Sequence, residues 1–311
     1  MTNENRQLLV TVIGGYLGSG KTTLVNHLLR HANGRRLAVL VNEFGELAID
    51  EDLIEAADDD VISIAGGCIC CSFGNDLAAT MMDLSKMSPA PDHILIESSG
   101  VAIPSAIVAT MSLLDGFRAD GVIVVTDAET LRKNAADDYI GDTIMRQLAD
   151  ADIVIVNKRD LVSEAMLQSL EYWLALAAPR ASVIEARHGQ VPLDALLGSR
   201  GPAVSETRWE HADRLFDSFV LLPSDAVEAA ALAELLATGP FGVVRAKGFW
   251  AGADGNCNLI HVVGQRWDCS PAGGSHPSGV VVIGKAGQLD RAGIEAATVS
   301  MASALRRGLR A

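Results

Sequence analysis

Residues 8–23 read LLVTVIGGYLGSGKTT, and this stretch decides the fold of the first part of the chain. A short apolar run leads into Gly15, four further residues, then Gly20, Lys21 and Thr22, and a helical segment follows. A strand, a glycine-rich turn and a helix in this order are the context that a P-loop requires. The glycines let backbone N–H groups close around phosphate at a helix N-terminus, where the helix dipole favours an anion. The stretch therefore predicts a phosphate-binding loop.

The side chains of this loop have predicted roles in holding a nucleotide. Lys21 is expected to reach the β- and γ-phosphates and to act in catalysis, and the Thr22 hydroxyl is expected to bind Mg²⁺. The other nucleotide-binding residues of the loop are expected to be Gly15, Gly18, Ser19, Gly20 and Thr23. The alternative interpretation is a glycine turn followed by a chance Lys-Thr pair.

Six short apolar runs alternate with longer amphipathic segments over the first two thirds of the chain. The runs are LLVTVIG (8–14), LAVLVN (37–42), HILIESS (93–99), GVIVVTD (121–127), ADIVIVNKRD (151–160) and ASVIEA (181–186). Continuous apolar runs between helical segments are typical of parallel strands that are buried on both faces of a sheet. The fold class predicted for residues 1–200 is α/β: a P-loop NTPase with a doubly wound, mainly parallel sheet.

A second, smaller domain is predicted after a linker. Over residues 201–213 the periodicity disappears while Gly, Pro, Ser and charged residues accumulate, as expected of a linker. Beyond it, residues 214–311 contain strand-like runs around a helical segment and end in an alanine-rich helix. This order predicts an α+β domain built on an antiparallel sheet.

The end of the fifth apolar run predicts that the bound nucleotide carries guanine. The run ends in Asn157, Lys158 and Asp160, the NKxD pattern of GTPases. The Asp160 carboxylate can accept hydrogen bonds from both the ring N–H and the exocyclic amine of guanine, whereas adenine presents an acceptor at the ring nitrogen. Asn157 is expected to brace the loop and the Lys158 stem to lie over the base. The cofactor predicted is GTP with Mg²⁺.

Acidic residues near the phosphates are candidates for metal binding and for positioning water. Glu97 ends the third apolar run and is expected to hold Mg²⁺, while Gly100 is expected to let a backbone N–H approach the γ-phosphate. Glu43 and Asp50 follow the second run and are candidates for orienting the attacking water. Nine acids lie between Glu43 and Asp60 without a Lys or Arg, so most of them must form a solvated acidic face.

The composition excludes several classes of partner. The 25 basic and 39 acidic residues give a net charge of −14, which opposes binding to nucleic acid. No apolar run approaches the roughly 18 residues that a membrane span needs. The N-terminal sequence lacks the apolar region and cleavage site of a secretory signal, so a cytoplasmic protein is expected.

Three of the five cysteines lie within GGCICCSFGNDL, residues 66–77. Thiolates are soft ligands that suit Zn²⁺, Co²⁺ or Cu(I), and Cys68, Cys70 and Cys71 supply up to three of the four ligands of a tetrahedral site. Glu46 is a candidate for an additional oxygen ligand. An incomplete site of this kind is what a metal carrier needs. The alternative is a group of core cysteines or a redox pair.

The order of these motifs resembles the CobW family of P-loop GTPases. The resemblance rests on GGYLGSGKTT, VNEFGELAID, GGCICC, ILIESSG and NKRD, and on RAKGFW, HVVGQRW and VVVIG in the second domain. It implies slow GTP hydrolysis with Mg²⁺, a Zn²⁺ or Co²⁺ ion held by the three cysteines when GTP is bound, and delivery of that ion to a client metalloprotein. A homodimer is one assembly that the sequence allows.

The chain departs from the family pattern at two places. Many members have a histidine-rich tract between the domains, but this chain keeps only His211 there. Relatives often have an acid before the proline that follows the ESSG motif, whereas this chain has Ile103 before Pro104. In the second domain the spacings of Cys257, His261, Cys269 and His276 fit no metal-ligand pattern, so we expect these four to be sheet or loop residues. Arg245 and Lys247 are expected to serve packing or a partner surface.

Two further functions compete with the metallochaperone interpretation. A small-metabolite kinase with redox-sensing cysteines predicts a preference for ATP, which the aspartate of the NKxD motif argues against. A metal buffer with a structural nucleotide predicts the same metal affinity in every nucleotide state. The sequence does not name the metal, the client or the pathway.

Overall fold

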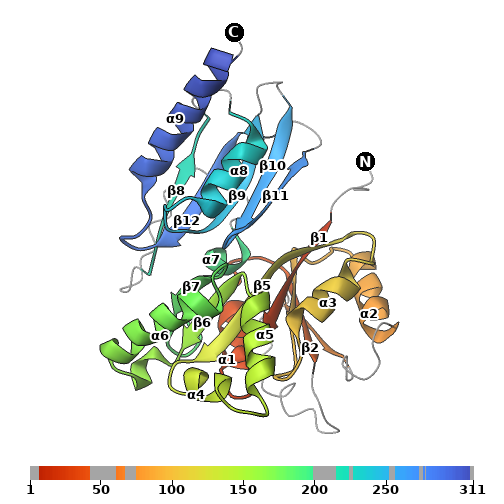
Figure 1. Ribbon diagram of the computed structural model, residues 1–311. Coiled ribbons are helices and arrows are strands. Elements are labelled where there is room, and N and C mark those ends of the chain that lie inside the picture. Colours follow the sequence, from red (N-terminus) through yellow and green to blue (C-terminus); the bar gives the residue numbers. More distant parts are fainter. Residues whose placement is uncertain are drawn as a thin grey trace. The chain divides into compact units, whose positions relative to one another are not determined.

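The structure is a computed structural model that describes residues 7–42, 61–66, 75–198, 215–223, 227–251, 256–272, 276 and 278–308 (Figure 1). The chain divides into two compact units, residues 1–193 and 194–311. Within the described residues, none of the helices is both long and apolar enough to cross a bilayer.

The first unit contains a seven-stranded sheet in the order β3-β2-β4-β1-β5-β6-β7, and every neighbouring pair is parallel. Its strands are β1 (Leu8–Gly14), β2 (Leu37–Asn42), β3 (Val61–Gly66), β4 (His93–Glu97), β5 (Phe117–Asp127), β6 (Ile153–Asn157) and β7 (Ser182–Glu185). Its helices are α1 (Lys21–Arg30), α2 (Asn75–Lys86), α3 (Pro104–Met111), α4 (Leu131–Ala135), α5 (Gly141–Asp150) and α6 (Glu164–Ala177), with a 3-10 turn η1 (Arg159–Leu161) after β6. The predicted α/β class with a parallel P-loop sheet is confirmed.

Helices cover both faces of this sheet, which explains why its strands are apolar almost throughout. On one face, alternate residues of the central strands pack against α2 and α3 and, farther along the sheet, against α4, α5 and α6. Figure 1 shows α1 on the opposite face, and its Leu24, Val25 and Leu28 are fully buried. The P-loop therefore emerges from the middle of the sheet with its helix packed beneath it.

Strand β3 corrects the number of strands expected from the apolar runs, which was six. Its sequence, VISIAG, follows an acidic segment and contains Ser63 among its apolar residues, so its pattern alone does not stand out. In the structure it pairs with β2 from Leu37↔Val61 to Asn42↔Gly66 and forms the edge of the sheet. The cysteine-containing segment thus begins at the carboxyl end of a strand.

The second unit contains a five-stranded antiparallel sheet in the order β11-β10-β9-β12-β8. Its strands are β8 (Phe216–Leu221), β9 (Val243–Ala251), β10 (Cys257–Val263), β11 (Arg266–Pro271) and β12 (Gly279–Lys285), and its helices are α7 (Leu193–Leu197, starting one residue before the unit), α8 (Ala229–Thr238) and α9 (Arg291–Gly308). Helices α8 and α9 pack on one face of the sheet around the buried Trp250. The predicted α+β class is confirmed.

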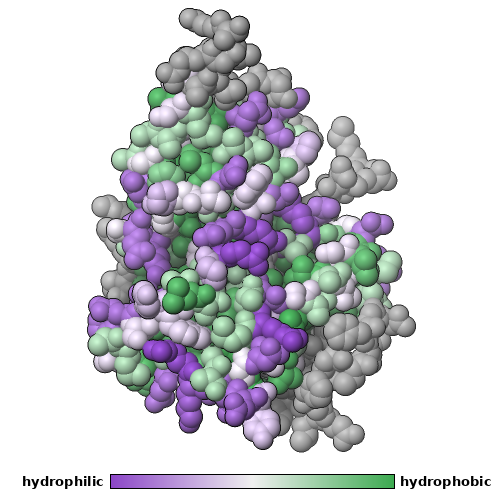
Figure 2. Space-filling view, in the orientation of Figure 1, coloured by the Kyte–Doolittle hydropathy of each residue, from purple (hydrophilic) through white to green (hydrophobic). Residues whose placement is uncertain are grey.

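The surface in view mixes polar and apolar residues. Figure 2 shows hydrophilic and hydrophobic residues interspersed over the part of the first unit that carries α4, α5 and α6. Exposed apolar side chains there include Tyr139, Tyr172 and Leu176. Single exposed apolar side chains of this kind are common on protein surfaces.

Arg245 on β9 serves packing, which was one of the two roles considered for it. The side chain is fully buried, and its Nη1 donates a hydrogen bond to the carbonyl oxygen of Leu196 on α7. Its Nη2 lies 3.2 Å from His261 Nε2 on β10, and because an arginine can only donate, the histidine nitrogen accepts. Arg245 therefore attaches α7 to the sheet of the second unit.

Replacing Arg245 by methionine is expected to lower the free energy of unfolding by about 3 kcal/mol. Methionine is of similar length and fills most of the space, but it leaves the buried Leu196 carbonyl without this donor. The shift of the urea unfolding midpoint measures the effect. Lys247→Met, two residues along the same strand at a half-buried position, is the control and is expected to change the midpoint little. Equal midpoints for the two variants would contradict the assignment.

Candidate nucleotide and metal site

The P-loop has a backbone conformation that two of its glycines make accessible. Gly15 has φ 132° and Gly20 has φ 102°, a region that residues with a side chain rarely adopt. A Cβ atom at Gly15 would collide with the Val125 carbonyl of β5, and one at Gly20 would collide with the side-chain amide of Asn157. The turn can therefore approach β5 and β6 closely only because these positions are glycine.

Thr22 and Glu97 meet at the N-terminus of α1. Thr22 Oγ1 donates a hydrogen bond of 2.9 Å to Glu97 Oε1, although 75 residues separate the two in sequence. The Glu97 side chain is 3% exposed, at the end of β4. A hydroxyl and a carboxylate are the hard oxygen ligands that Mg²⁺ prefers. The residues present therefore fit a Mg²⁺ ion beside the phosphate-binding loop.

Ser19 and Lys21 supply polar groups within the loop itself. Ser19 is 3% exposed, and its hydroxyl makes no hydrogen bond within the described part of the chain. Lys21 is the first residue of α1 and is 9% exposed. Burial of these groups suits a site in which they contact a bound anion rather than water. Thr23, also expected to contact the nucleotide, is exposed on α1.

Asn157 connects the P-loop to a second loop. Its Nδ2 donates to the Ser19 carbonyl at 3.0 Å, and its Oδ1 accepts from the backbone N–H of Gly189 at 3.0 Å. The side chain is 2% exposed at the end of β6. Three loops, those after β1, β6 and β7, are thereby held together by one amide.

Lys158 and Asp160 follow Asn157 and face different surroundings. Lys158 has φ 59°, and its Nζ donates at 2.8 Å to Asp127 Oδ2 at the end of β5. Asp160 lies in η1 and is exposed. The ion pair holds the lysine beside the loop, while the aspartate carboxylate is accessible to a ligand.

The carboxyl ends of three strands lie side by side in the part of the sheet that leads into the cysteine segment. Val41 of β2 pairs with Ala65 of β3 on one side and with Glu97 of β4 on the other. Because neighbouring strands are about 4.8 Å apart, the end of β3 lies about 10 Å from Glu97. Cys68 follows β3 by two residues in the sequence.

Several of the expected site residues lie outside the described residues. They are the candidates for positioning water, Glu43 and Asp50, and the candidates for binding the transferred metal, Glu46, Cys68, Cys70 and Cys71. Their roles remain predictions from the sequence.

His261 and His276 of the second unit have partners other than a metal ion. His261 accepts from Arg245, and the His276 ring stacks on Phe249 at a centroid distance of 3.9 Å. Burial raises the pKa of the Cys269 thiol, with the charge of Asp268 adding to the effect, which disfavours the thiolate that metal binding requires. Across the described ranges no group of three metal-binding side chains occurs.

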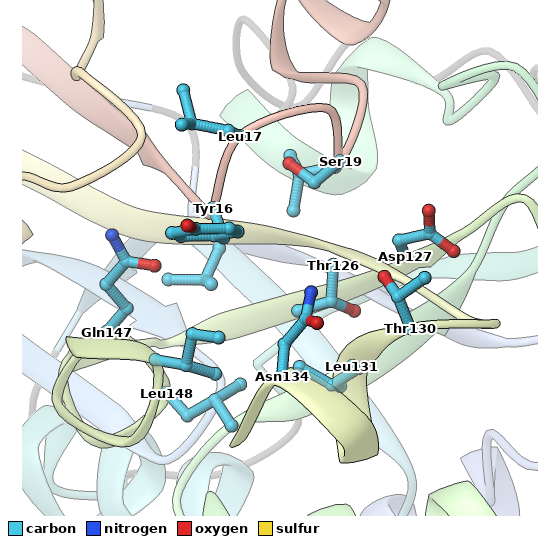
Figure 3. Close-up of a pocket in the computed structure, with 13 residues that line it drawn as sticks. Tyr16, Leu17, Ser19, Thr126, Asp127, Thr130, Leu131, Asn134, Gln147 and Leu148 are labelled. Carbon is cyan, nitrogen blue, oxygen red and sulfur yellow. The ribbon is translucent and has the colours of Figure 1, made fainter. Parts of the chain in front are cut away.

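A pocket lies beside the P-loop, between it and the helices α4 and α5 (Figure 3). It is lined by Tyr16, Leu17 and Ser19 of the P-loop, by residues 124–127 of β5, and by Thr130, Leu131, Asn134, Ile144, Gln147 and Leu148. Figure 3 shows the side-chain amide of Gln147 beside the Tyr16 ring. The helices that follow β5 therefore contribute polar groups next to the phosphate-binding loop.

Two residues near the site were not anticipated from the sequence. Asp127 ends an apolar strand, as Glu97 does, and that position was a sufficient signal. Gln147 lies between Ile144 and Leu148 on the buried face of α5, so a polar residue within an apolar stripe was the available signal.

Comparisons with known proteins show what this chain is similar to. The family model described as CobW/HypB/UreG, nucleotide-binding domain, matches residues 9–185, and the model of the cobalamin synthesis protein cobW C-terminal domain matches residues 216–301. The zinc chaperone CobW of Sinorhizobium sp is 32% identical, with 94% of this chain and 96% of the relative covered. The zinc-regulated GTPase metalloprotein activator 1 of Dictyostelium discoideum is 28% identical, with 78% of this chain and 62% of the relative covered. A crystal structure of Zn(II)-bound YjiA GTPase from E. coli is 25% identical with a TM-score of 0.49, covering 96% of this chain and 99% of that chain.

The nucleotide-binding model spans more than half of the chain, and the first of these relatives spans nearly all of it. The resemblance deduced from the P-loop, NKRD and GGCICC motifs is confirmed. The chain belongs to the CobW/HypB/UreG family of nucleotide-binding proteins and carries the CobW C-terminal domain after its P-loop unit.

Proposed function

We propose that this protein is a GTP-hydrolysing metallochaperone. In this proposal it binds Zn²⁺ or Co²⁺ through Cys68, Cys70 and Cys71 and delivers the ion to a client metalloprotein when GTP is hydrolysed. Relatives named as a zinc chaperone and as a zinc-regulated GTPase metalloprotein activator support this class of function.

The contacts around the P-loop support the nucleotide half of the proposal. Glu97 and Thr22 lie together where Mg²⁺ would be held, and Asn157 joins the P-loop to the loop that carries Asp160. These are the two ends of a guanine nucleotide site, one for the phosphates and one for the base. Asn157 lies between the phosphate-binding loop and the base-binding loop. This position supports the proposal that both loops bind the same nucleotide.

Hydrolysis would rely on electrostatic stabilisation by groups already in place. Lys21 and the P-loop N–H groups neutralise charge that spreads over the phosphate oxygens as the terminal phosphoryl group departs. A Mg²⁺ ion held by Thr22 and Glu97 supplies further positive charge to these oxygens when it is bound. Glu43 or Asp50 would orient the attacking water.

The cysteine motif supports the metal half of the proposal by its chemistry. Three thiolates with one oxygen ligand, for which Glu46 is the candidate, suit Zn²⁺ or Co²⁺ and leave a site that a client can compete for. Transfer then consists of ligand exchange, in which client side chains replace the cysteines one at a time.

The pairing of β2 with both β3 and β4 is the observation that supports coupling between nucleotide binding and metal binding. The strand that leads to the cysteines ends about 10 Å from Glu97, with only β2 between them. A change at the γ-phosphate that moves the loop after β4 has a short path to the segment after β3. This arrangement supports the proposal that metal affinity depends on the nucleotide.

Replacing Cys70 by alanine is expected to weaken Zn²⁺ binding about 100-fold and to leave GTP binding unchanged. If the roughly 10–16 kcal/mol of a four-ligand zinc site is shared equally, one thiolate contributes about 3 kcal/mol, or a factor of about 100. Competition with a chromophoric chelator measures the dissociation constants of Zn²⁺ and Co²⁺ in the presence of Mg-GTP analogue, Mg-GDP or no nucleotide.

Cys257→Ala is the matched control, because Cys257 is a free cysteine of the second unit, and metal affinity in this variant should equal that of the wild type. Unchanged Zn²⁺ affinity in Cys70→Ala would contradict the chaperone proposal. Equal metal affinity in all three nucleotide states would instead support a metal buffer in which the nucleotide is structural.

A further inference from the structure

Gln147 is a polar side chain on the buried face of α5. It lies three residues after Ile144 and directly before Leu148, both of which pack in the core, and it is 1% exposed. Burying a side-chain amide costs free energy unless its hydrogen-bonding groups are satisfied. The partners of this amide therefore show which part of the fold it serves.

Both partners lie in the loop that follows β4. Gln147 Nε2 donates to the Gly100 carbonyl at 3.1 Å and to the Ala102 carbonyl at 2.8 Å. A second residue of the same helix holds the first turn of α3, where this loop ends, because Asp150 Oδ2 accepts from the backbone N–H of Ser105 at 2.8 Å. Helix α5 thus holds the loop after β4 at two points and the start of α3 at a third.

The opposite side of this loop lies against the P-loop. A Cβ atom at Gly100 would lie 2.9 Å from the backbone nitrogen of Leu17 and 2.7 Å from its side chain, so the two backbones are in close contact. The N–H of Ser98 donates to the carbonyl of Ile13 at 2.9 Å, at the end of β1. The loop is held between the P-loop on one side and Gln147 on the other, and Figure 3 shows the Gln147 side chain beside Tyr16 of the P-loop.

We propose that Gln147 is a positioning residue that holds the loop after β4 ready for the γ-phosphate and so sets the preference of the site for GTP over GDP. The inference rests on the proposed guanine-nucleotide function. Gln147 contacts neither the P-loop N–H groups nor Asp160 in any described hydrogen bond, so it acts through the backbone of residues 100–102.

The effect follows from the geometry of the peptide plane. Holding the carbonyl of Gly100 fixes the orientation of the whole planar peptide group, including the N–H of Val101, which points the opposite way. A loop fixed before the ligand arrives loses less conformational entropy when it binds. In this proposal only a nucleotide with a γ-phosphate contacts this loop. The affinity for GDP is therefore expected to be independent of Gln147.

Replacing Gln147 by leucine tests the proposal. Leucine fills the buried space but removes both donors, and the ratio of the affinity for a non-hydrolysable GTP analogue to that for GDP is expected to fall about tenfold or more. Titration calorimetry with each nucleotide and Mg²⁺ measures this ratio in the full-length chain. A merely structural role would weaken both nucleotides equally and leave the ratio unchanged.

Two variants serve as controls. Thr110→Val on α3 removes a partly buried hydrogen bond to Ala106 within the same unit, and it should change neither the melting temperature nor the ratio much, because the helix already pairs this carbonyl. Gln168→Leu makes the same substitution at an exposed position of α6 and should change neither. A folded Gln147→Leu protein with the wild-type ratio overturns the proposal for Gln147 alone. A wild type that binds no guanine nucleotide overturns the proposed function instead.

Hydrogen–deuterium exchange of the wild type tests the same coupling without a substitution. The GTP analogue, but not GDP, is expected to slow exchange in residues 98–105 and in residues 141–150 together. Protection of the loop without protection of α5, or equal exchange with both nucleotides, contradicts the proposal even if the leucine variant fails to fold.

Discussion

Replacing Asp160 by asparagine is expected to weaken GTP binding about 100-fold or more and to create affinity for xanthine triphosphate. Guanine presents two donors, and the exposed carboxylate of Asp160 can accept from both; each such charged hydrogen bond contributes about 1.5–3 kcal/mol, so their loss corresponds to about 10²–10⁴-fold. Xanthine has a carbonyl in place of the exocyclic amine, and an asparagine amide can donate to that carbonyl while accepting from the ring N–H. Calorimetry measures the dissociation constants for GTP, ATP and xanthine triphosphate. These values test whether the preference changes from GTP to xanthine triphosphate.

Asp142→Asn is the matched control for this experiment. Asp142 is an exposed aspartate of α5 that pairs with Arg146 on the surface, so its substitution removes the same charge away from the site. GTP affinity should be unchanged in this variant. Wild-type GTP affinity in Asp160→Asn would show that another residue recognises the base. A preference of the wild type for ATP would favour the small-metabolite kinase.

Replacing Lys21 by alanine is expected to lower kcat for GTP hydrolysis about 10²–10³-fold. The lysine begins α1 at the phosphate-binding loop and is 9% exposed, so its charge acts in a site from which water is largely excluded. That environment strengthens its interaction with charge developing on the phosphate oxygens. The affinity for GTP should fall more than that for GDP, because GDP lacks the γ-phosphate. Phosphate release under saturating GTP measures kcat.

Lys133→Ala on α4 is the control, since this lysine is exposed and lies outside the P-loop. It should hydrolyse GTP at the wild-type rate. Hydrolysis at that rate by Lys21→Ala would rule out a role for Lys21 in stabilising the transition state. A protein that no longer binds GDP would indicate instead that the loop itself is disrupted, which circular dichroism and the melting temperature distinguish.

The features of the site that the sequence predicted are those encoded in contiguous residues. Gly15, Gly20 and Lys21 specify a strand, a turn and a helix within a single stretch, and the structure has this order. Glu97 and Asn157 each end an apolar run, and parallel strands bring their carboxyl ends to one edge of a sheet. Position within a local pattern was therefore enough to place these residues in the same region.

The features that the sequence did not predict depend on pairs of residues far apart along the chain. Gln147 and Gly100 are 47 residues apart, and Asn157 and Ser19 are 138 residues apart. Strand β3 was missed because it follows an acidic segment and Ser63 interrupts its apolar residues, and its pairing with β2 is what defines it as a strand. Arg245 was expected to serve either packing or a partner surface, and its contact with Leu196, 49 residues away in the sequence, shows that it serves packing.

The sequence by itself determined the α/β class, the phosphate-binding turn, the candidate guanine reader and the three clustered thiols, because each depends on local conformation or on the chemistry of neighbouring side chains. Only the tertiary structure decided that Asn157 joins three loops, that the cysteine segment starts beside β2 and near Glu97, and that Gln147 holds the loop after β4. Strand order and register fix these distances, and they result from pairing all seven strands in one sheet, which no single segment of the sequence specifies.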